Sequence, residues 1–416
     1  MKNKVPKLRF PEFSGEWEEK KLGEISEISS GLTPLRSEKK YFENGEIPWI
    51  KTTDLNNGNI LKSEELITTY ALEKTTLKLL PKNTVLIAMY GGFNQIGRTG
   101  ITQIETTINQ AISALILKKN YSSHYILQYL NGFKEKWKQV AASSRKDPNI
   151  TKKDVENFKI SISSLPEQEK IASFLSKVDE SIEILEEEKE LWKKYKKGMI
   201  QKIFSQKLRF KDENGNDYPE WEESNLEKIA EVNPKTEAVP ERFIYIDLES
   251  VENGLLKNEK IVLKNEAPSR AQRVLKSNDI LYQTVRPYQK NNFYFENTNK
   301  IYPFVASTGY AQIRTSQNSK YLYHFLHTDK FVDSVLERCT GTSYPAINSS
   351  DLKLIKFNLP SLPEQEKIAN FLSSIDEKIE LIEKELEGIK GVPSGKRGIT
   401  TLRIFLTIYD PFIFNA

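Results

Sequence analysis

The sequence predicts a mixed α/β (α+β) protein made of two similar globular domains, each followed by a long coiled-coil helix. Three observations lead to this prediction. The chain repeats itself at a spacing of about 200 residues, each repeat contains strand-like and helical segments, and each repeat closes with a sustained heptad pattern. With 416 residues the chain is also too long for one hydrophobic core, because a domain commonly holds about 150 residues.

The internal duplication rests on three pairs of matching segments. They are 7–10 (KLRF) with 207–210 (KLRF), 15–28 (GEWEEKKLGEISEI) with 219–232 (PEWEESNLEKIAEV), and 164–183 (SLPEQEKIASFLSKVDESIE) with 361–380 (SLPEQEKIANFLSSIDEKIE). The last pair differs at only four positions, whereas the parts between the matching segments diverge. Each copy is therefore expected to hold a variable globular part and a nearly invariant helix.

Each globular part has segments typical of strands, followed by a helix. The strand-like segments are 46–55, 83–90 and 109–117 in the first copy and 243–251, 278–285 and 311–314 in the second. The helices are predicted over 122–138 and 319–337, with Ser122 or Ser123 and Asn318 or Ser319 as N-caps.

The nearly invariant segments carry apolar residues at the a and d positions of a coiled coil. These are Ile171, Leu175, Val178, Ile182 and Leu185 in the first copy and Ile368, Leu372, Ile375, Ile379, Ile382 and Leu386 in the second. Pro166 and Pro363 stand in the first turn, and glutamates beside them favour the positive end of a helix. The first helix is predicted over 166–204, about 57 Å at 1.5 Å per residue. Two unrelated amphipathic helices, each packed on its own domain, are the alternative.

These patterns give the expected boundaries of the parts. We expect globular domains at 1–163 and 207–360, helices at 164–206 and 361–391, and a tail at 392–416. The tail departs from the first copy, since Pro393 falls where Lys196 stands, and Lys396 and Thr400 replace seam residues. The second helix is therefore expected to stop near residue 390, which would weaken its pairing.

Composition excludes several classes of protein. Hydrophobic residues make up 38% and charged residues 28%, as in globular domains. No run of 18 apolar residues is present, and the start MKNKVPKLRFPEF lacks the apolar core of a secretory signal. Cys339 is the single cysteine, which excludes an internal disulfide framework and a four-cysteine zinc site. The cytoplasm is the expected location.

The distribution of charge indicates a polyanionic ligand. The net charge is only +4, yet residues 1–165 carry 25 basic and 18 acidic side chains, and 257–320 carry 11 and 4. Two basic regions separated by nearly neutral connectors fit a polyanion. Two lysine-rich surfaces that merely keep the chain in solution are the alternative.

No set of residues assembles into a catalytic or metal site. The segment from Gly92 to Thr99 resembles a phosphate-binding P-loop, but Arg98 replaces the lysine and a β-branched segment follows in place of a helix. His324 and His327 share a helical face without a third ligand, and Cys339 has no nearby histidine partner. Asn233-Pro234 stands alone, without the tetrad or the glycine-rich loop of an adenine methyltransferase. We therefore predict a binding protein with no catalytic residue and no metal.

Polar loops at equivalent places in both copies hold the residue types that read DNA. Arginine pairs with guanine and Asn or Gln with adenine in the major groove, while lysine neutralises phosphates. The candidates are Asn94, Gln95, Arg98, Asn109, Gln110, Arg145, Lys146, Gln283, Thr284, Arg286, Tyr288, Gln289, Lys290, Asn291, Ser343 and Tyr344.

With these residues in place, the chain resembles the specificity (S) subunit of type I restriction-modification systems. The resemblance is carried by IPWIKTTDL and YIDLESV, by the TTINQAI and VASTGYA pair, and above all by SLPEQEKIA, which occurs twice. It covers about residues 1–390. The family implies two target-recognition domains joined by two antiparallel helices, each domain reading one half of a bipartite DNA sequence and the helices setting the spacer.

The resemblance also implies partners and cofactors. Two methyltransferase (M) subunits would bind S-adenosylmethionine and methylate adenine, and restriction (R) subunits would use ATP and Mg²⁺, so no cofactor is expected in this chain. Two alternatives stay open. One is a standalone sequence-specific DNA-binding protein, or a remnant whose altered end no longer recruits enzymes. The other is an enzyme with an unrecognised nuclease site, built on clusters such as Glu18-Glu19-Lys20.

Overall fold

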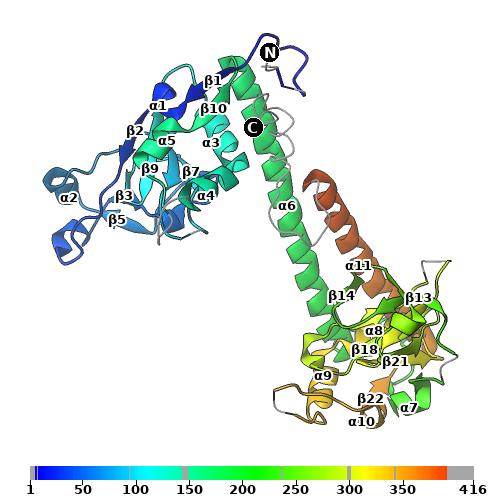
Figure 1. Cartoon of the computed structure of the whole chain (residues 1–416). Coiled ribbons are helices and arrows are strands. Elements are labelled where there is room, and N and C mark those ends of the chain that lie inside the picture. The colour runs from blue at the N-terminus through cyan, green and yellow to red at the C-terminus, as the bar shows by residue number, and fades with distance from the viewer. Residues whose placement is uncertain are drawn as a thin grey trace. The chain divides into compact units, whose positions relative to one another are not determined.

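The computed structural model describes residues 5–6, 8–92, 94–142, 149–235, 238–297, 301–341 and 343–390. The described residues divide into two compact units, one formed by those up to residue 186 with 383–390 and the other by those within 187–382. Both units combine strands and helices (Figure 1), which confirms the predicted mixed α/β class. In the described part of the chain, no helix is both long and apolar enough to cross a membrane.

The first unit is built around a five-stranded sheet of order β2-β9-β6-β7-β4 and a three-stranded sheet of order β5-β3-β8. Its strands are β1 (Glu18–Lys21), β2 (Ser26–Ser30), β3 (Ile47–Ile50), β4 (Asn59–Ile60), β5 (Glu65–Ile67), β6 (Val85–Ala88), β7 (Thr99–Thr102), β8 (Thr107–Ile108), β9 (Ile112–Leu117) and β10 (Lys159–Ile162). Its helices are α1 (Leu22–Ile25), α2 (Thr69–Lys74), α3 (Ser123–Gly132), α4 (Lys134–Ala142), α5 (Lys152–Asn157) and the first part of α6 (Leu165–Phe204).

The second unit holds two four-stranded sheets, of order β12-β21-β18-β19 and β16-β13-β20-β17. Its strands are β11 (Glu222–Asn225), β12 (Ala230–Val232), β13 (Arg242–Ile246), β14 (Val251–Glu252), β15 (Leu255–Leu256), β16 (Lys260–Leu263), β17 (Ala271–Val274), β18 (Ile280–Gln283), β19 (Phe293–Tyr294), β20 (Phe304–Ser307), β21 (Tyr310–Thr315) and β22 (Lys356–Leu359). Its helices are α7 (Leu226–Ile229), α8 (Ser319–Leu326), α9 (Asp329–Leu336), α10 (Ser349–Lys353) and most of α11 (Leu362–Lys390).

The predicted helices 122–138 and 319–337 are each two helices, which corrects the prediction. Ser122 and Asn318 cap the first helix of each pair, since their side chains accept the N–H of Tyr125 and Tyr321. The first copy then breaks at Phe133, and in the second copy Thr328 caps α9. A continuous apolar pattern hides such a break, because the helix on each side keeps the same buried face.

The residues predicted at the a and d positions of the coiled coil have different surroundings along the two long helices. Ile171 and Leu175 are buried in the core of the first unit, among side chains such as Trp17 and Tyr125, so they serve the domain and are not a free coiled-coil seam. Ile182, Ile382 and Leu386 are buried, whereas Val178, Leu185 and Ile379 are partly exposed. Some turns of these helices therefore pack on their own domain, as in the alternative interpretation, and other turns form the predicted helix–helix seam.

Within the second unit, α11 packs against the C-terminal part of α6 (Figure 1). One cluster joins Ile368, Leu372, Ile375 and Ile379 of α11 to Trp192, Met199, Ile200, Ile203 and Phe204 of α6. Lys196 Nζ lies 2.5 Å from Asp376 Oδ1, and Lys378 Nζ lies 3.2 Å from Glu188 Oε1. Residue numbers rise along one helix as they fall along the other, so the two helices run antiparallel here. The predicted stop after residue 390 and the tail lie outside the described residues.

A buried ion pair fastens the start of each long helix to its unit. Glu167 is 1% exposed and accepts Arg9 Nε and Nη2, both at 2.7 Å, and Trp17 Nε1 at 3.3 Å. Glu364 is 0% exposed and accepts Arg209 Nε at 3.2 Å and Nη2 at 2.9 Å, and Trp221 Nε1 at 3.0 Å. These glutamates are therefore buried partners of arginine, and their role at the helix end is more than the favourable electrostatics expected from the sequence. We call the two sets the Arg–Glu–Trp locks.

The next residue of each repeat also has the same role in both units. Gln168 accepts the N–H of Ser122 at 3.0 Å and donates to Ser163 O at 2.8 Å. Gln365 accepts the N–H of Asn318 at 3.2 Å and donates to Pro360 O at 2.8 Å. The near-identity of SLPEQEKIA in the two copies thus has a physical reason, because its buried glutamate and glutamine hold each domain on its helix.

Candidate nucleic-acid interface

In the first unit, the loop after β6 (residues 90–98, the first-unit loop) is held at its start by two neighbouring segments. Met89 N donates to Ala111 O at 2.8 Å, and Met89 O accepts Ile150 N at 2.9 Å. The loop therefore lies beside the turn that contains Asn109 and Gln110 and beside the segment that leads into α5. Three segments that are distant in sequence meet at this point.

The second unit repeats this arrangement at the loop after β18 (residues 285–292, the second-unit loop). Thr284 N donates to Gly309 O at 3.2 Å, and Thr284 O accepts Ile347 N at 3.0 Å. Val285 and Thr340 each form a bridge with Ala346, so the 340–346 segment lies against this loop. The structure thus brings the candidates of the 283–292 and 343–344 segments together.

Glycine shapes the first-unit loop where it contacts α4. Gly97 has φ +72°, and a Cβ there would lie 2.9 Å from the Cβ of Trp137. No other residue type fits so close an approach in this conformation. The neighbouring Arg98 Nη1 donates to Gln95 Oε1 at 2.9 Å, while Asn94 is exposed. Arg98 is therefore positioned by Gln95 beside the start of α4.

Lys134, the first residue of α4, is a cation that the sequence did not single out. Burial lowers the pKa of Lys134, and the nearby charges of Lys138 and Arg98 lower it further. Within the described ranges no carboxylate forms an ion pair with it, whereas Lys138 is paired with Glu135 at 2.8 Å. Arg98 and Lys134 thus make a small positive site that an anion would stabilise. Arg145 and Lys146, also predicted to bind DNA, lie outside the described residues.

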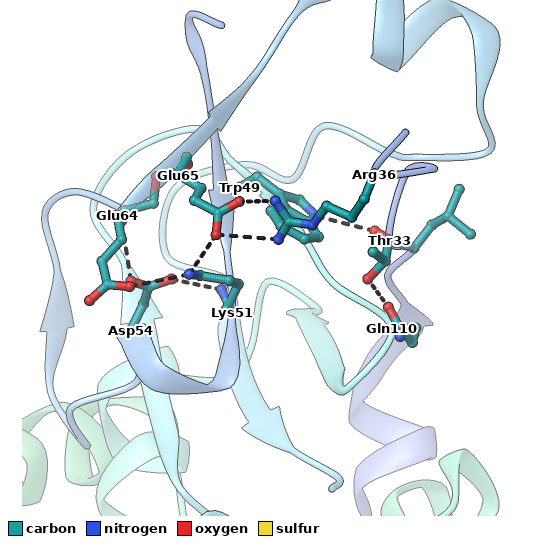
Figure 2. Close-up of polar contacts among 10 residues, drawn as sticks. Thr33, Arg36, Trp49, Lys51, Asp54, Glu64, Glu65 and Gln110 are labelled. Carbon is teal, nitrogen blue, oxygen red and sulfur yellow. Dashed lines mark hydrogen bonds and ion pairs between the residues drawn. The ribbon is translucent and has the colours of Figure 1, made fainter. Parts of the chain in front are cut away.

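Gln110 is linked to a polar network that the sequence also missed. Its side chain contacts the hydroxyl of Thr33, at the start of the segment that carries Arg36 (Figure 2). Asn109 is partly exposed, and its Oδ1 is used within the turn, where it accepts Ala111 N at 3.1 Å. Of the two neighbours, the exposed Gln110 is thus the one available for recognition.

Arg36 is held on three sides. Its guanidinium lies 4.8 Å from the ring centre of Phe42 and 4.9 Å from that of Trp49, and Nη1 lies 2.5 Å from Glu65 Oε2. Glu65 also accepts Lys51 Nζ at 2.8 Å (Figure 2), and these two cations lower the pKa of Glu65. Because Glu64 and Asp54 add two more carboxylates, the network has no surplus positive charge for phosphate. We therefore assign this network a structural role, which is to hold the segment that carries Thr33 and Arg36 beside Gln110.

In the second-unit loop, several predicted contact residues are used inside the protein. Gln283 is 3% exposed, and its Nε2 donates to Val285 O at 2.7 Å and Gln289 Oε1 at 2.9 Å. Thr284 Oγ1 donates to Gly309 O at 2.8 Å, and Asn291 Nδ2 donates to Val251 O at 2.6 Å. These three side chains therefore shape the loop, which leaves contact with bases to their neighbours.

The outward-facing residues of this loop and of the adjoining 340–346 segment include aromatic and cationic side chains. Tyr288 is 49% and Tyr344 is 63% exposed, and Gln289 and Ser343 are also exposed. The Arg286 guanidinium lies 4.2 Å from the ring centre of Tyr344. Lys290 Nζ lies 2.5 Å from Asp329 Oδ1, so its charge is already balanced.

Of the two histidines of α8 and its C-cap, His324 is buried and His327 is partly buried, and both are neutral near pH 7. Burial lowers the pKa of His324 well below its usual value and that of His327 to about 4. His327 Nδ1 lies 2.7 Å from Tyr323 O, and its Nε2 lies 3.4 Å from Asn292 Nδ2. Among the residues that the structure describes, no three His, Cys, Asp or Glu side chains group as metal ligands.

Comparison with known proteins gives concordant results. The family profile "Type I restriction modification DNA specificity domain" matches residues 14–192 and 218–391. The type I restriction enzyme MjaIX specificity subunit of Methanocaldococcus jannaschii is 25% identical over 408 residues, which cover 91% of this chain and 90% of that protein. The Escherichia coli EcoR124I/EcoR124II specificity subunit is 30% identical over 177 residues, covering 41% of this chain and 43% of the relative.

A solved structure shares the fold. The crystal structure of the type I restriction-modification system S subunit from M. genitalium superposes with a TM-score of 0.60 at 18% identity and covers 98% of each chain. The two profile matches coincide with the two repeats, each of which ends in SLPEQEKIA and its helix. The chain therefore belongs to the type I restriction-modification DNA specificity family.

Proposed function

We propose that this chain is the noncatalytic specificity subunit of a type I restriction-modification complex and that each unit reads one half of a bipartite, asymmetric DNA site. One observation carries this proposal. The first-unit and second-unit loops start from the same backbone hydrogen bonds, on Met89 and Thr284, yet they differ in nearly every polar side chain. Equivalent scaffolds with unlike side chains are what two different half-sites require.

The residues proposed to face DNA are fewer than those predicted from the sequence. In the first unit they are Asn94, Gln95, Arg98 and Gln110, with Lys134 added; in the second they are Arg286, Tyr288, Gln289, Ser343 and Tyr344. Lys290 is proposed to contact the phosphate backbone of the DNA. Its ion pair with Asp329 would be replaced there by an ion pair with a phosphate, at little cost in free energy. Arg145 and Lys146 stay predictions from the sequence.

The long helices are proposed to set the spacer and to dock two methyltransferase subunits, with restriction subunits joining that core. The 40 residues of α6 amount to about 60 Å, whereas successive major grooves on one face of DNA lie roughly 34–36 Å apart. We propose the division into 1–163, 164–206, 207–360, 361–391 and 392–416 for this purpose. S-adenosylmethionine, ATP and Mg²⁺ would then be bound by the partners.

A DNA reader that has lost its enzyme partners is the second candidate. The observation that favours it is the sequence after residue 390, where Pro393, Lys396 and Thr400 replace what the first repeat has. Such a chain would bind DNA through the same loops, but no methylation would depend on it.

An adenine-methylation map of the host genome, with this gene intact and deleted, tests the proposal. We expect one bipartite asymmetric motif to lose methylation on deletion. If no motif changes, the C-terminal helix should be extended with the first repeat's sequence 193–204 and the map repeated. Methylation that appears only then supports the second candidate, and a map unchanged by both steps refutes the specificity function.

A further inference from the structure

We propose that Arg286 reads a guanine in the half-site bound by the second unit and that its left-handed backbone is retained for this purpose. This inference rests on the proposed function, since it assumes that the second-unit loop faces DNA. The inference goes beyond the proposed function by naming one residue, one base and the reason that the two units cannot share a target at this position.

The two repeats can be aligned residue by residue into this loop. Asn83 and Asn278 both have positive φ, +64° and +73°, just before β6 and β18. Eight positions later, without a gap, the first repeat has Gly91 with φ +114° and the second has Arg286 with φ +54°. The fold therefore demands a positive φ at this position in both units.

Glycine meets that demand without strain, whereas an arginine does not. Residues other than glycine, asparagine and aspartate seldom adopt the left-handed region, because Cβ approaches the following carbonyl oxygen. Strained residues of this kind persist mainly at functional sites. The first repeat shows that the loop can be built with glycine at this position. The arginine of the second repeat is therefore not needed for the stability of the loop, and we assign it to recognition.

The side chain of Arg286 is stiffened and left with its donors unused. Its guanidinium carbon lies 4.2 Å from the ring centre of the exposed Tyr344, while its backbone N–H donates to Pro345 O at 2.8 Å. Among the described residues, no side-chain or backbone oxygen accepts from its guanidinium and no carboxylate pairs with it; Nε is buried without a partner. Lys290 makes a sharp contrast, since it is also left-handed, with φ +52°, but is paired with Asp329.

A guanidinium held over a ring can present its donors to the O6 and N7 acceptors of guanine in the major groove. Such a fork delivers two parallel hydrogen bonds, which single out guanine among the four bases. A phosphate would accept the same charge from a lysine and needs no fixed plane. The contact with Tyr344 limits the positions open to the guanidinium, which favours a base over the backbone.

The test is selection of bound sequences from a pool of randomised 40-base-pair duplexes by the purified full-length chain. Wild type is expected to enrich a bipartite motif. Arg286→Gly is expected to lose the preference for guanine at one position, by roughly 5- to 150-fold, with every other position unchanged. Arg286→Lys keeps the charge and can still donate to guanine, so it should retain a weaker preference at the same position. Asn253→Gly is the matched control, because it changes another left-handed residue of the second unit (φ +53°, between β14 and β15) that lies outside the proposed interface, and it should leave the base preferences unchanged.

Thermal unfolding of the same variants separates recognition from folding. Arg286→Gly should unfold within about 5 °C of wild type, because relief of the left-handed backbone offsets the greater entropy that glycine gives the unfolded chain. A larger fall in the unfolding temperature would give Arg286 a structural role and overturn the inference. So would an Arg286→Gly motif identical to that of wild type. If wild type enriches no motif at all, it is the proposed function that fails, and the inference with it.

Discussion

The Arg–Glu–Trp lock of the second unit gives a prediction with a calculable size. Arg209→Met removes two hydrogen bonds to Glu364 and leaves that carboxylate, which is 0% exposed, with Trp221 as its remaining side-chain partner. Arg209 also donates to Tyr218 O at 3.1 Å and Pro219 O at 2.6 Å, and these bonds go too. Breaking one side of a buried ion pair costs about 3–5 kcal/mol, because the other charge stays buried without compensation.

Hydrogen exchange followed separately in each unit is the assay, since a chain of two units does not unfold in one step. A loss of about 3–5 kcal/mol raises the exchange rate of globally protected amides by roughly two to four orders of magnitude. The increase is expected at β11, β22 and the first turns of α11, all in the second unit. The first-unit amides at β1, β10 and the start of α6 serve as the internal control.

A second substitution decides whether the buried charge is the cause. Glu364→Gln in the Arg209→Met background removes the charge but still accepts the Trp221 N–H, so the double variant should exchange more slowly than Arg209→Met alone. Arg9→Met, with or without Glu167→Gln, should reproduce the pattern in the first unit. An increase of less than about tenfold for Arg209→Met, or a double variant that is worse than the single one, would refute this account of the lock.

Three further predictions follow from single residues. Burial raises the pKa of Asp179, so the protonated carboxyl group is compatible with the fold at low pH, and its ionisation opposes folding as pH rises through the folded pKa. Asp179→Asn keeps the hydrogen bond from Gln128 and carries no charge. In thermal unfolding it should therefore stabilise the first unit at pH 7 and have no effect below pH 3.8. Asp376→Asn, at the same place in the other repeat, loses its ion pair with Lys196 and should be destabilising. Gly97→Ala should cost about 1–3 kcal/mol by urea unfolding, because the methyl group would meet Trp137, whereas Gly92→Ala, also at positive φ but in open space, measures the backbone strain alone. Lys134→Gln should reduce the slope of log affinity against log salt by about one without altering base preference, while Lys136→Gln, on another face of α4, should change the slope by less than half as much.

The sequence predicted what depends on local pattern. The heptads predicted α6 and α11, the strand-like runs predicted β6, β9, β13, β18 and β21, and Ser122 and Asn318 were among the expected caps. What it missed depends on partners that are distant in the chain. Glu167 looks like an exposed residue of a first helical turn until Arg9, 158 positions away, is seen beside it. Arg36 is fixed by Glu65, 29 positions away, and Lys134 matters only because Gly97 brings Arg98 to α4.

Burial also explains why the proposed interface is smaller than the predicted one. Gln283 has a side chain of the type that reads adenine, but its equivalent in the first repeat is Ala88, which is fully buried at the end of β6. A position that is buried in one repeat is expected to be buried in the other, and the amide is therefore used within the loop. Because Ala88 belongs to the apolar run VLIAM (85–89), alignment of the two repeats already indicates from the sequence that position 283 is an interior one.

The same comparison shows how one fold can carry two specificities. At three equivalent pairs near the loops, Ala88/Gln283, Met89/Thr284 and Gly91/Arg286, the side chains differ completely. The bonds that both loops share run through the backbone N–H and C=O of Met89 and Thr284, which every residue type except proline can supply. The contacts that hold each domain on its helix lie elsewhere, in the Arg–Glu–Trp locks and the glutamines beside them. Because this shared support does not depend on the side chains that differ between the loops, those side chains can change without loss of it, and a strained residue such as Arg286 can be tolerated in one unit alone.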